Sequence, residues 1–184
     1  MATTTIGLVG AGTMGSGIAQ AGALSGYDVT MQDISDKQVA TGIKGITKSL
    51  ERLAAREKIS SDDQSSALAR IQGTTILEDL SECDVVIEAA TENIDLKIAV
   101  FGQLDELCKS DAILASNTSS LSITRLAAAT RRPDRVIGLH FFNPVPIMKL
   151  VEIVRALQTS DDTFTEMDTL TRQLGKEPVS VQDS

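Results

Sequence analysis

Short apolar runs alternate along the chain with longer segments in which apolar residues recur at helical spacing. The runs predict β-strands at residues 6–9, 28–32, 85–88, 113–116, 136–140, 150–154 and, from a shorter pattern, 179–181. Most of these runs are apolar throughout, which is typical of parallel strands that are covered on both faces. The alternation therefore predicts an α/β protein with a mostly parallel sheet and helices on both faces.

The segments between the runs predict helices. Apolar residues lie three or four positions apart across residues 43–53, 94–104 and 164–174, which indicates three amphipathic helices. Residues 60–63 offer N-cap side chains for a short helix that continues to Arg70, and Asp161 with Asp162 offers them for the last long helix. No repeat or Pro/Gly-rich linker divides the chain, so we expect residues 1–184 to form a single domain.

Charge and composition narrow the class of partner. Seventeen Lys and Arg residues against 25 Asp and Glu residues give a net charge of −8, which argues against a nucleic acid or an anionic membrane and favours a small molecule. No apolar run approaches the roughly 20 residues of a membrane span, and the first residues lack a signal-peptide layout, so a cytoplasmic protein is expected. Cys83 and Cys108 have no metal-site spacing and are expected to be reduced thiols, with no bound metal.

A glycine-rich turn follows the first predicted strand and precedes a predicted helix. In the pattern G-x-G-x-x-G the first glycine allows a tight turn, the second lets the backbone approach a pyrophosphate, and the third allows close packing of helix on strand. The next strand is followed by Asp33, an acidic residue suited to an adenosine ribose, and no basic residue comes before Lys37. The pattern predicts NAD, rather than NADP, bound by Gly10, Ala11, Gly12, Thr13, Met14, Gly15 and Asp33.

Four motifs occur in order along the chain: GAGTMG at 10–15, EAATENIDLK at 88–97, SNTSS at 116–120 and GLHFFNPVP at 138–146. From about Thr5 to its end the chain thereby resembles the NAD-binding domain of 3-hydroxyacyl-CoA dehydrogenases, the bacterial 3-hydroxybutyryl-CoA dehydrogenases in particular. The resemblance implies a Rossmann-like, doubly wound sheet. It also implies reversible oxidation of an (S)-3-hydroxyacyl-CoA to the 3-oxoacyl-CoA with NAD, in fatty-acid or butanoate metabolism.

The resemblance also assigns roles to particular residues. It implies that His140 is the catalytic base, that Glu152 is its carboxylate partner and that Ser119 bonds the substrate oxygen. Cofactor contacts are implied for Glu92, Lys97 and Asn143, and CoA contacts for Ser49 and Arg56. The family often has Lys where this chain has Arg56, and the two side chains differ in reach.

The chemistry of alcohol oxidation agrees with these roles. When hydride leaves a secondary alcohol, the hydroxyl proton must leave too, so a base must lie within hydrogen-bond reach of that oxygen. His140, the only histidine, ends the predicted strand 136–140, at the edge where open α/β sheets bind ligands. Glu152 lies on the next predicted strand and can orient the imidazole. Ser119 lies in a loop whose helix cap can be provided by Ser122.

The family continues into a mostly helical second domain that completes the acyl pocket and forms a homodimer, and this domain is expected to be absent from the 184 residues. Two hypotheses follow: a fragment of an enzyme for 3-hydroxybutyryl-CoA and acetoacetyl-CoA with impaired turnover, or a non-catalytic NAD-binding module. The joint presence of Ser119, His140 and Glu152 favours the enzyme. The 3-hydroxyisobutyrate and 6-phosphogluconate dehydrogenases also open with a glycine-rich turn ending in Met-Gly, but they have no counterpart of HFFNP.

Overall fold

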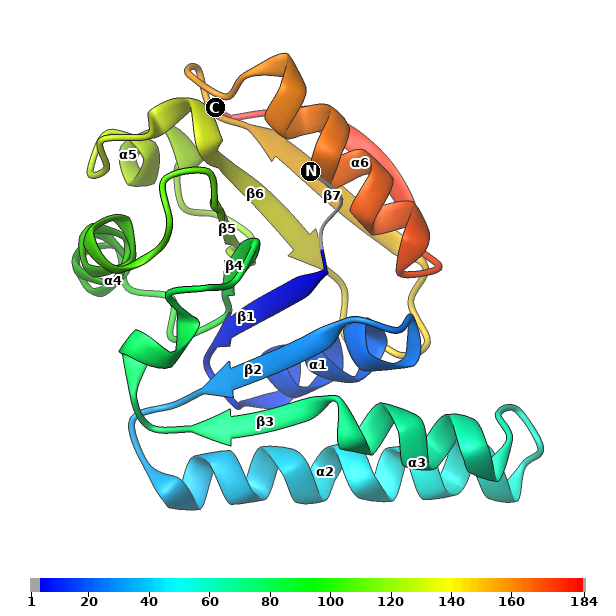
Figure 1. Cartoon of the computed structure of the whole chain (residues 1–184). Coiled ribbons are helices and arrows are strands. Elements are labelled where there is room, and N and C mark those ends of the chain that lie inside the picture. Colours follow the sequence, from blue (N-terminus) through cyan, green and yellow to red (C-terminus); the bar gives the residue numbers. More distant parts are fainter. Residues whose placement is uncertain (1–3, 184) are drawn as a thin grey trace.

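The computed structural model describes residues 4–183, which build one eight-stranded sheet with helices on both faces (Figure 1). The strand order is β3-β2-β1-β4-β5-β6-β7-β8, and within the described residues every pairing is parallel except that of β6 with β7. The order of the first six strands is that of a doubly wound Rossmann sheet, which confirms the predicted fold class. The strands are β1 (Thr5–Val9), β2 (Asp28–Gln32), β3 (Ile71–Thr74), β4 (Val85–Glu88), β5 (Ile113–Ser116), β6 (Val136–Phe141), β7 (Leu150–Arg155) and β8 (Glu177–Gln182).

The helices form two layers with separate cores. They are α1 (Thr13–Leu24), α2 (Asp36–Ala55), α3 (Ser61–Ala69), α4 (Ile94–Leu107), α5 (Ile123–Ala127) and α6 (Asp161–Gln173), with short 3-10 helices η1 (Leu77–Leu80) and η2 (Pro133–Arg135). One core joins the sheet to α1, α2, α3 and α6, and the other joins it to α4 and α5, which lie together on one side of the strands (Figure 1). No helix among residues 4–183 is both long enough and apolar enough to cross a bilayer.

Strand β4 shows why the predicted strands are apolar throughout. Val85 and Ile87 belong to the core beneath α1, whereas Val86 between them belongs to the core beneath α4. Since successive side chains point to opposite faces, a strand covered on both faces needs apolar residues at every position. Phe101 and Leu104 of α4 complete the second core, and both are fully buried.

Apart from strand ends that differ by one residue, three features of the elements differ from the sequence predictions. Strand β3 was not predicted, because only Ile71 is apolar in its sequence IQGT. Strand β8 is longer than the predicted 179–181. The N-cap of α6 is Ser160, whose hydroxyl accepts a hydrogen bond from the Thr163 amide, rather than Asp161 or its neighbour. The two aspartates instead occupy the first turn, where negative charge favours the helix dipole.

Cys83 and Cys108 are free thiols buried in the core beneath α4. Burial is the main cause that raises the pKa of Cys83 to about 12, and it also raises the pKa of Cys108. Because the thiolate is the reactive form, both side chains act as small apolar core residues.

Candidate active site

The glycine-rich turn between β1 and α1 has the geometry of a phosphate cradle. Gly10 has a φ of +107°, and a Cβ atom there would lie 2.8 Å from the carbonyl oxygen of Ala89. A Cβ on Gly15 would overlap the carbonyl oxygen of Gly10, so helix and turn pack too closely for any side chain. A Cβ on Gly12, by contrast, would meet nothing within 4 Å. The space above Gly12 is therefore open to a ligand that needs close approach to the backbone.

The N-terminus of α1 faces this space without a side-chain cap. Gly12 is its N-cap residue and supplies no capping hydrogen bond, and the first turn carries no acidic residue. Free backbone N–H groups and the positive end of the helix dipole are therefore available to an anion. The residues present fit the pyrophosphate of a dinucleotide.

Asp33 lies directly after β2, beside the glycine-rich turn. Its Oδ2 accepts a hydrogen bond from the Ala11 amide at 2.7 Å, and its Oδ1 accepts one from the Ile34 amide at 2.7 Å. Each carboxylate oxygen retains a lone pair, so Asp33 can still accept from ribose hydroxyls. Asp33 lines a cavity of about 290 Å³, together with the exposed apolar side chains of Ile34 and Leu96. This combination of a carboxylate and apolar surface is suited to an adenosine.

His140 and Glu152 form a hydrogen-bonded pair at the carboxyl end of β6. The Nδ1 of His140 lies 2.9 Å from Oε2 of Glu152. An ionised carboxylate only accepts hydrogen bonds, so Nδ1 is the donor in this pair, and in the neutral imidazole the other ring nitrogen, Nε2, keeps its lone pair. Phe142 packs against the imidazole with ring centroids 4.5 Å apart. This arrangement presents a basic nitrogen in a fixed orientation.

The loop after β5 carries Ser119 and is held from several sides. Asn117 accepts a hydrogen bond from the Phe141 amide at 2.9 Å, which ties the loop to β6. Ser122 is the N-cap of α5, as predicted, so Ser119 is not used as the cap. Asp183, after β8, accepts hydrogen bonds from the Ser122 hydroxyl and from the first backbone amides of α5. Ser119 itself is exposed.

Glu92 connects Ser119 to Lys97. Its Oε1 accepts hydrogen bonds from the Thr118 hydroxyl at 2.7 Å and from the Ser119 amide at 3.0 Å, and its Oε2 lies 3.4 Å from Nζ of Lys97. Burial would raise the pKa of Glu92, but these hydrogen bonds and the charge of Lys97 together outweigh burial and lower the pKa. Glu92 therefore faces the site as a carboxylate.

The cavities bring most of the predicted site residues together. Besides the cavity beside Asp33, two others are lined by such residues. One, of about 290 Å³, is lined by Met14, Glu92, Lys97, Ser119, His140 and Asn143 among others. A second cavity, of about 390 Å³, lies between α1, α2 and residues 143–146, and it is lined by Gly12, Thr13, Ser49 and Asn143 among others. Arg56 lies apart from both cavities, as the exposed C-cap residue of α2.

No role was assigned from the sequence to Glu88, Asn117 or Asp183, although the first two lie within the motifs EAATENIDLK and SNTSS. Glu88 is fully buried, and its carboxylate pairs with Lys97. An acidic residue that ends a continuous apolar strand is a signal that could have drawn attention to it, since such a position faces the ligand edge of the sheet. Asn117 follows another strand end, whereas nothing near Asp183 in the sequence indicates contact with α5.

Comparisons with known proteins agree with this geometry. The family model "3-hydroxyacyl-CoA dehydrogenase, NAD binding domain" matches residues 5–184. A 3-hydroxybutyryl-CoA dehydrogenase of Bradyrhizobium diazoefficiens is 44% identical over 97% of this chain and 61% of its own length. One of Clostridioides difficile is 44% identical over 97% of this chain and 64% of its own length.

A solved structure gives the same result. The crystal structure of (S)-3-hydroxybutyryl-CoA dehydrogenase from Ralstonia eutropha superposes with a TM-score of 0.97 at 55% identity, covering 100% of this chain and 65% of that one. The chain thus spans about three fifths of the length of the curated relatives that it matches. NAD is the cofactor of the matching domain, in agreement with the cradle. The chain belongs to the 3-hydroxyacyl-CoA dehydrogenase family and corresponds to its NAD binding domain.

Proposed function

We propose that this chain provides the NAD-binding and catalytic part of an enzyme that oxidises (S)-3-hydroxybutyryl-CoA to acetoacetyl-CoA. The observation that carries this proposal is the His140–Glu152 pair, in which His140 lines the same cavity as Ser119. A module that only bound NAD would need the cradle but not this pair. The names of the relatives described above support the acyl-CoA substrate.

The chain's own residues supply the proton chemistry. NAD, when bound, supplies the acceptor for the hydride that leaves C3 of the substrate. Nε2 of His140 takes the hydroxyl proton, and the Glu152 carboxylate stabilises the imidazolium that results. The Ser119 hydroxyl can donate a hydrogen bond to the same oxygen, whether this is a hydroxyl or a carbonyl.

The inner surface of α2 supports CoA as the carrier. Ser49 lines the cavity between α1 and α2. Arg52 and Arg56 lie three and seven residues further along, so they continue the same helix face beyond the cavity. Both are exposed, and no ion pair engages either of them within the described residues. In a protein of net charge −8 these cations suit the phosphates of CoA.

Apolar surface beside the catalytic pair supports an acyl substrate. Leu150 and Val179 are 37% and 48% exposed. Leu150 is two residues from Glu152 on β7, and Val179 pairs with Glu152 from β8, so all three side chains lie on the same face of the sheet. This face is suited to an acyl chain and to the further part of the protein that the longer relatives have. As the resemblance implies, we place the dimer contacts in that further part and the whole protein in the cytoplasm.

One experiment separates an enzyme from a pure NAD-binding module. NAD is titrated into the chain by calorimetry, and NADH oxidation by acetoacetyl-CoA is then followed by absorbance. The assay uses the chain both alone and extended with the remaining residues of the Ralstonia eutropha relative, each compared with its His140→Ala variant. We expect every form to bind NAD. We expect the extended chain to oxidise NADH, and His140→Ala to abolish this oxidation. Binding without oxidation in any form would instead favour the module.

A further inference from the structure

A buried ion pair lies beneath the cavity that contains His140. Lys97 is 2% exposed and Glu88 is 0% exposed. Nζ of Lys97 lies 2.7 Å from both carboxylate oxygens of Glu88. The Ala90 amide and the Ser116 hydroxyl donate to the same carboxylate, each at 2.7 Å. The carboxylate of Glu88 is thus held by four hydrogen bonds, and its position is fixed by three neighbouring segments.

Lys97 is shared between two carboxylates. Besides its contacts to Glu88, its ammonium lies 3.4 Å from Oε2 of Glu92, which is 45% exposed and lines the cavity. Two carboxylates and one ammonium sum to a net charge of −1 at this wall of the cavity. If Glu88 were neutral, the positive charge of Lys97 and the negative charge of Glu92 would cancel.

The fold alone does not account for these charges. Burying an ion pair costs desolvation that its attraction barely offsets, and apolar residues of similar volume often stabilise a core as well or better. The pair lies at the carboxyl ends of β4 and β5, where Glu88 is the partner of Val9 on one side and Ser116 on the other. That edge of the sheet is where the fold binds its ligand.

The chemistry of hydride transfer places the nicotinamide in the same cavity. The substrate carbon that loses hydride carries the hydroxyl that His140 deprotonates, so the ring that receives hydride must lie next to His140. Lys97 and Glu92 form other walls of that cavity. The nicotinamide ring is cationic in NAD+ and neutral in NADH, so a fixed charge nearby acts on one form and not on the other.

We infer that Glu88 is a positioning residue that, through Lys97, sets a net negative charge at the cofactor and shifts the relative affinity of the site toward NAD+ and away from NADH. This inference rests on the proposed function, since it requires the nicotinamide to lie beside His140.

The test compares the dissociation constants of NAD+ and NADH, measured by calorimetry on the chain itself. We call the dissociation constant of NADH divided by that of NAD+ the preference for NAD+. Glu88→Gln leaves the cavity wall formed by Lys97 and Glu92 neutral. We expect the preference to fall on the order of tenfold, the size expected for one unit charge several ångströms away. For a two-electron couple, that ratio equals a shift of about 30 mV in the potential of the bound cofactor. Lys97→Met leaves the fully buried Glu88 carboxylate without its cation, so Glu88 takes up a proton and Glu92 alone stays charged. The preference of this variant should therefore stay close to that of the wild type.

The double variant Glu88→Gln with Lys97→Met leaves only Glu92 and should restore the preference of the wild type. A matched control is Glu106→Gln, which removes an exposed charge near the other end of α4. If Glu88→Gln folds poorly, as judged by circular dichroism, Glu92→Gln decides the question: it leaves the charges of Lys97 and Glu88 to cancel and should lower the preference for NAD+ by the same factor.

Equal changes in both dissociation constants in Glu88→Gln, or a double variant that keeps the lowered ratio of Glu88→Gln, would overturn the inference and leave the pair a structural role. If the wild type bound neither NAD+ nor NADH, the proposed function itself would fail. The two failures are therefore distinguishable.

Discussion

His140 and Glu152 lie directly opposite each other in the antiparallel pair of β6 and β7, and their side chains are joined by a contact of 2.9 Å. Register in a sheet is set by backbone hydrogen bonds, and a slip of one residue would turn Glu152 to the other face. The flanking partners Leu139 and Ile153 are both buried, which opposes such a slip. The orientation of the imidazole is thus fixed by the sheet itself.

Glu152→Gln should lower the rate of acetoacetyl-CoA reduction by about tenfold to a hundredfold. The amide oxygen can still accept from Nδ1 of His140, so the tautomer is kept, but the negative charge that stabilises the imidazolium is lost. NADH absorbance in the extended chain measures the rate, and calorimetry should find NAD affinity unchanged. Glu177→Gln, on the neighbouring strand β8, is the control. Equal rates for the two variants would contradict the proposed role.

Gly12→Ala and Gly15→Ala should have opposite effects. A Cβ on Gly12 meets only open space, so this variant should keep its melting temperature but lose NAD affinity by about tenfold or more, because the methyl group occupies the place of the pyrophosphate. A Cβ on Gly15 overlaps the Gly10 carbonyl, so that variant should lose about 2 kcal/mol of stability or more. Thermal unfolding and NAD titration separate the two effects. Full NAD affinity in Gly12→Ala would show that the phosphates bind elsewhere.

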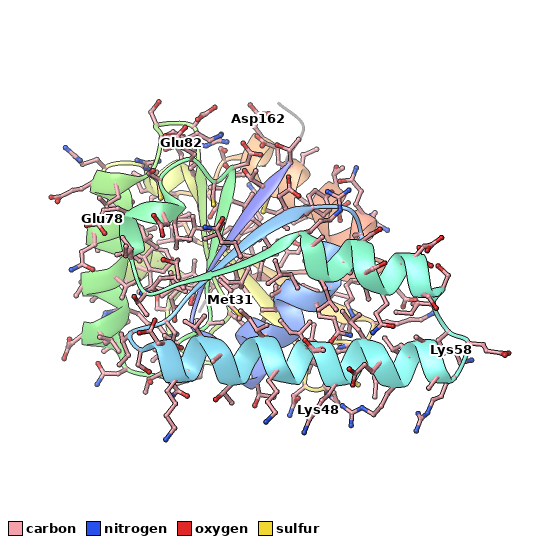
Figure 2. The ribbon with its side chains drawn as sticks, turned by 60° about the horizontal axis from the view of Figure 1, so that its bottom comes forward. Met31, Lys48, Lys58, Glu78, Glu82 and Asp162 are labelled. Atoms are coloured by element: carbon pink, nitrogen blue, oxygen red, sulfur yellow. The ribbon has the colours of Figure 1, made fainter. Side chains whose placement is uncertain are left out.

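Arg56→Gln should weaken the binding of acetoacetyl-CoA about fivefold at low salt, because a charge-assisted contact to a phosphate is lost. The difference from the wild type should shrink as salt is raised, since Arg56 is exposed. Lys44→Gln removes an exposed charge from another face of α2 and serves as the control. Figure 2 shows Lys48 on the side of this helix that is turned away from the sheet. Because Lys48 lies four residues before Arg52 and so neighbours it on the helix, Lys48→Gln should weaken binding, but less than Arg56→Gln. Equal losses in all three variants would indicate a general effect of charge.

Asp183→Asn should reduce stability at neutral pH by about 1 kcal/mol, the usual worth of a helix cap. Burial would raise the pKa of Asp183, but the hydrogen bonds from Thr124, Ser122 and Ile123 outweigh burial and lower it. A carboxylate whose pKa is lowered by folding stabilises the fold above its ordinary pKa, and this stabilisation is lost as the pH falls through the lowered value. Urea unfolding should therefore show a difference between wild type and variant near pH 7 that shrinks below about pH 4. A difference independent of pH would contradict this account.

Local sequence was sufficient for every strand except β3 and for the cofactor turn. Strand β4 was predicted with its observed bounds, because a strand buried on both faces is apolar at every position. Gly10 and Gly15 were recognised because their spacing reflects contacts within one turn of chain. Strand β3 was missed because it pairs with β2 alone and lies at the edge of the sheet, where apolar residues are not required.

The sequence by itself determined the order of the elements, the phosphate cradle and the residue types available to the site, since each depends on neighbours in the chain. Only the tertiary structure decided that β7 runs antiparallel to β6 and so places Glu152 against His140. It also decided that Glu88 is buried against Lys97. Burial of a charge depends on what covers it, and here the covering groups come from separate strands and helices that sequence periodicity does not relate.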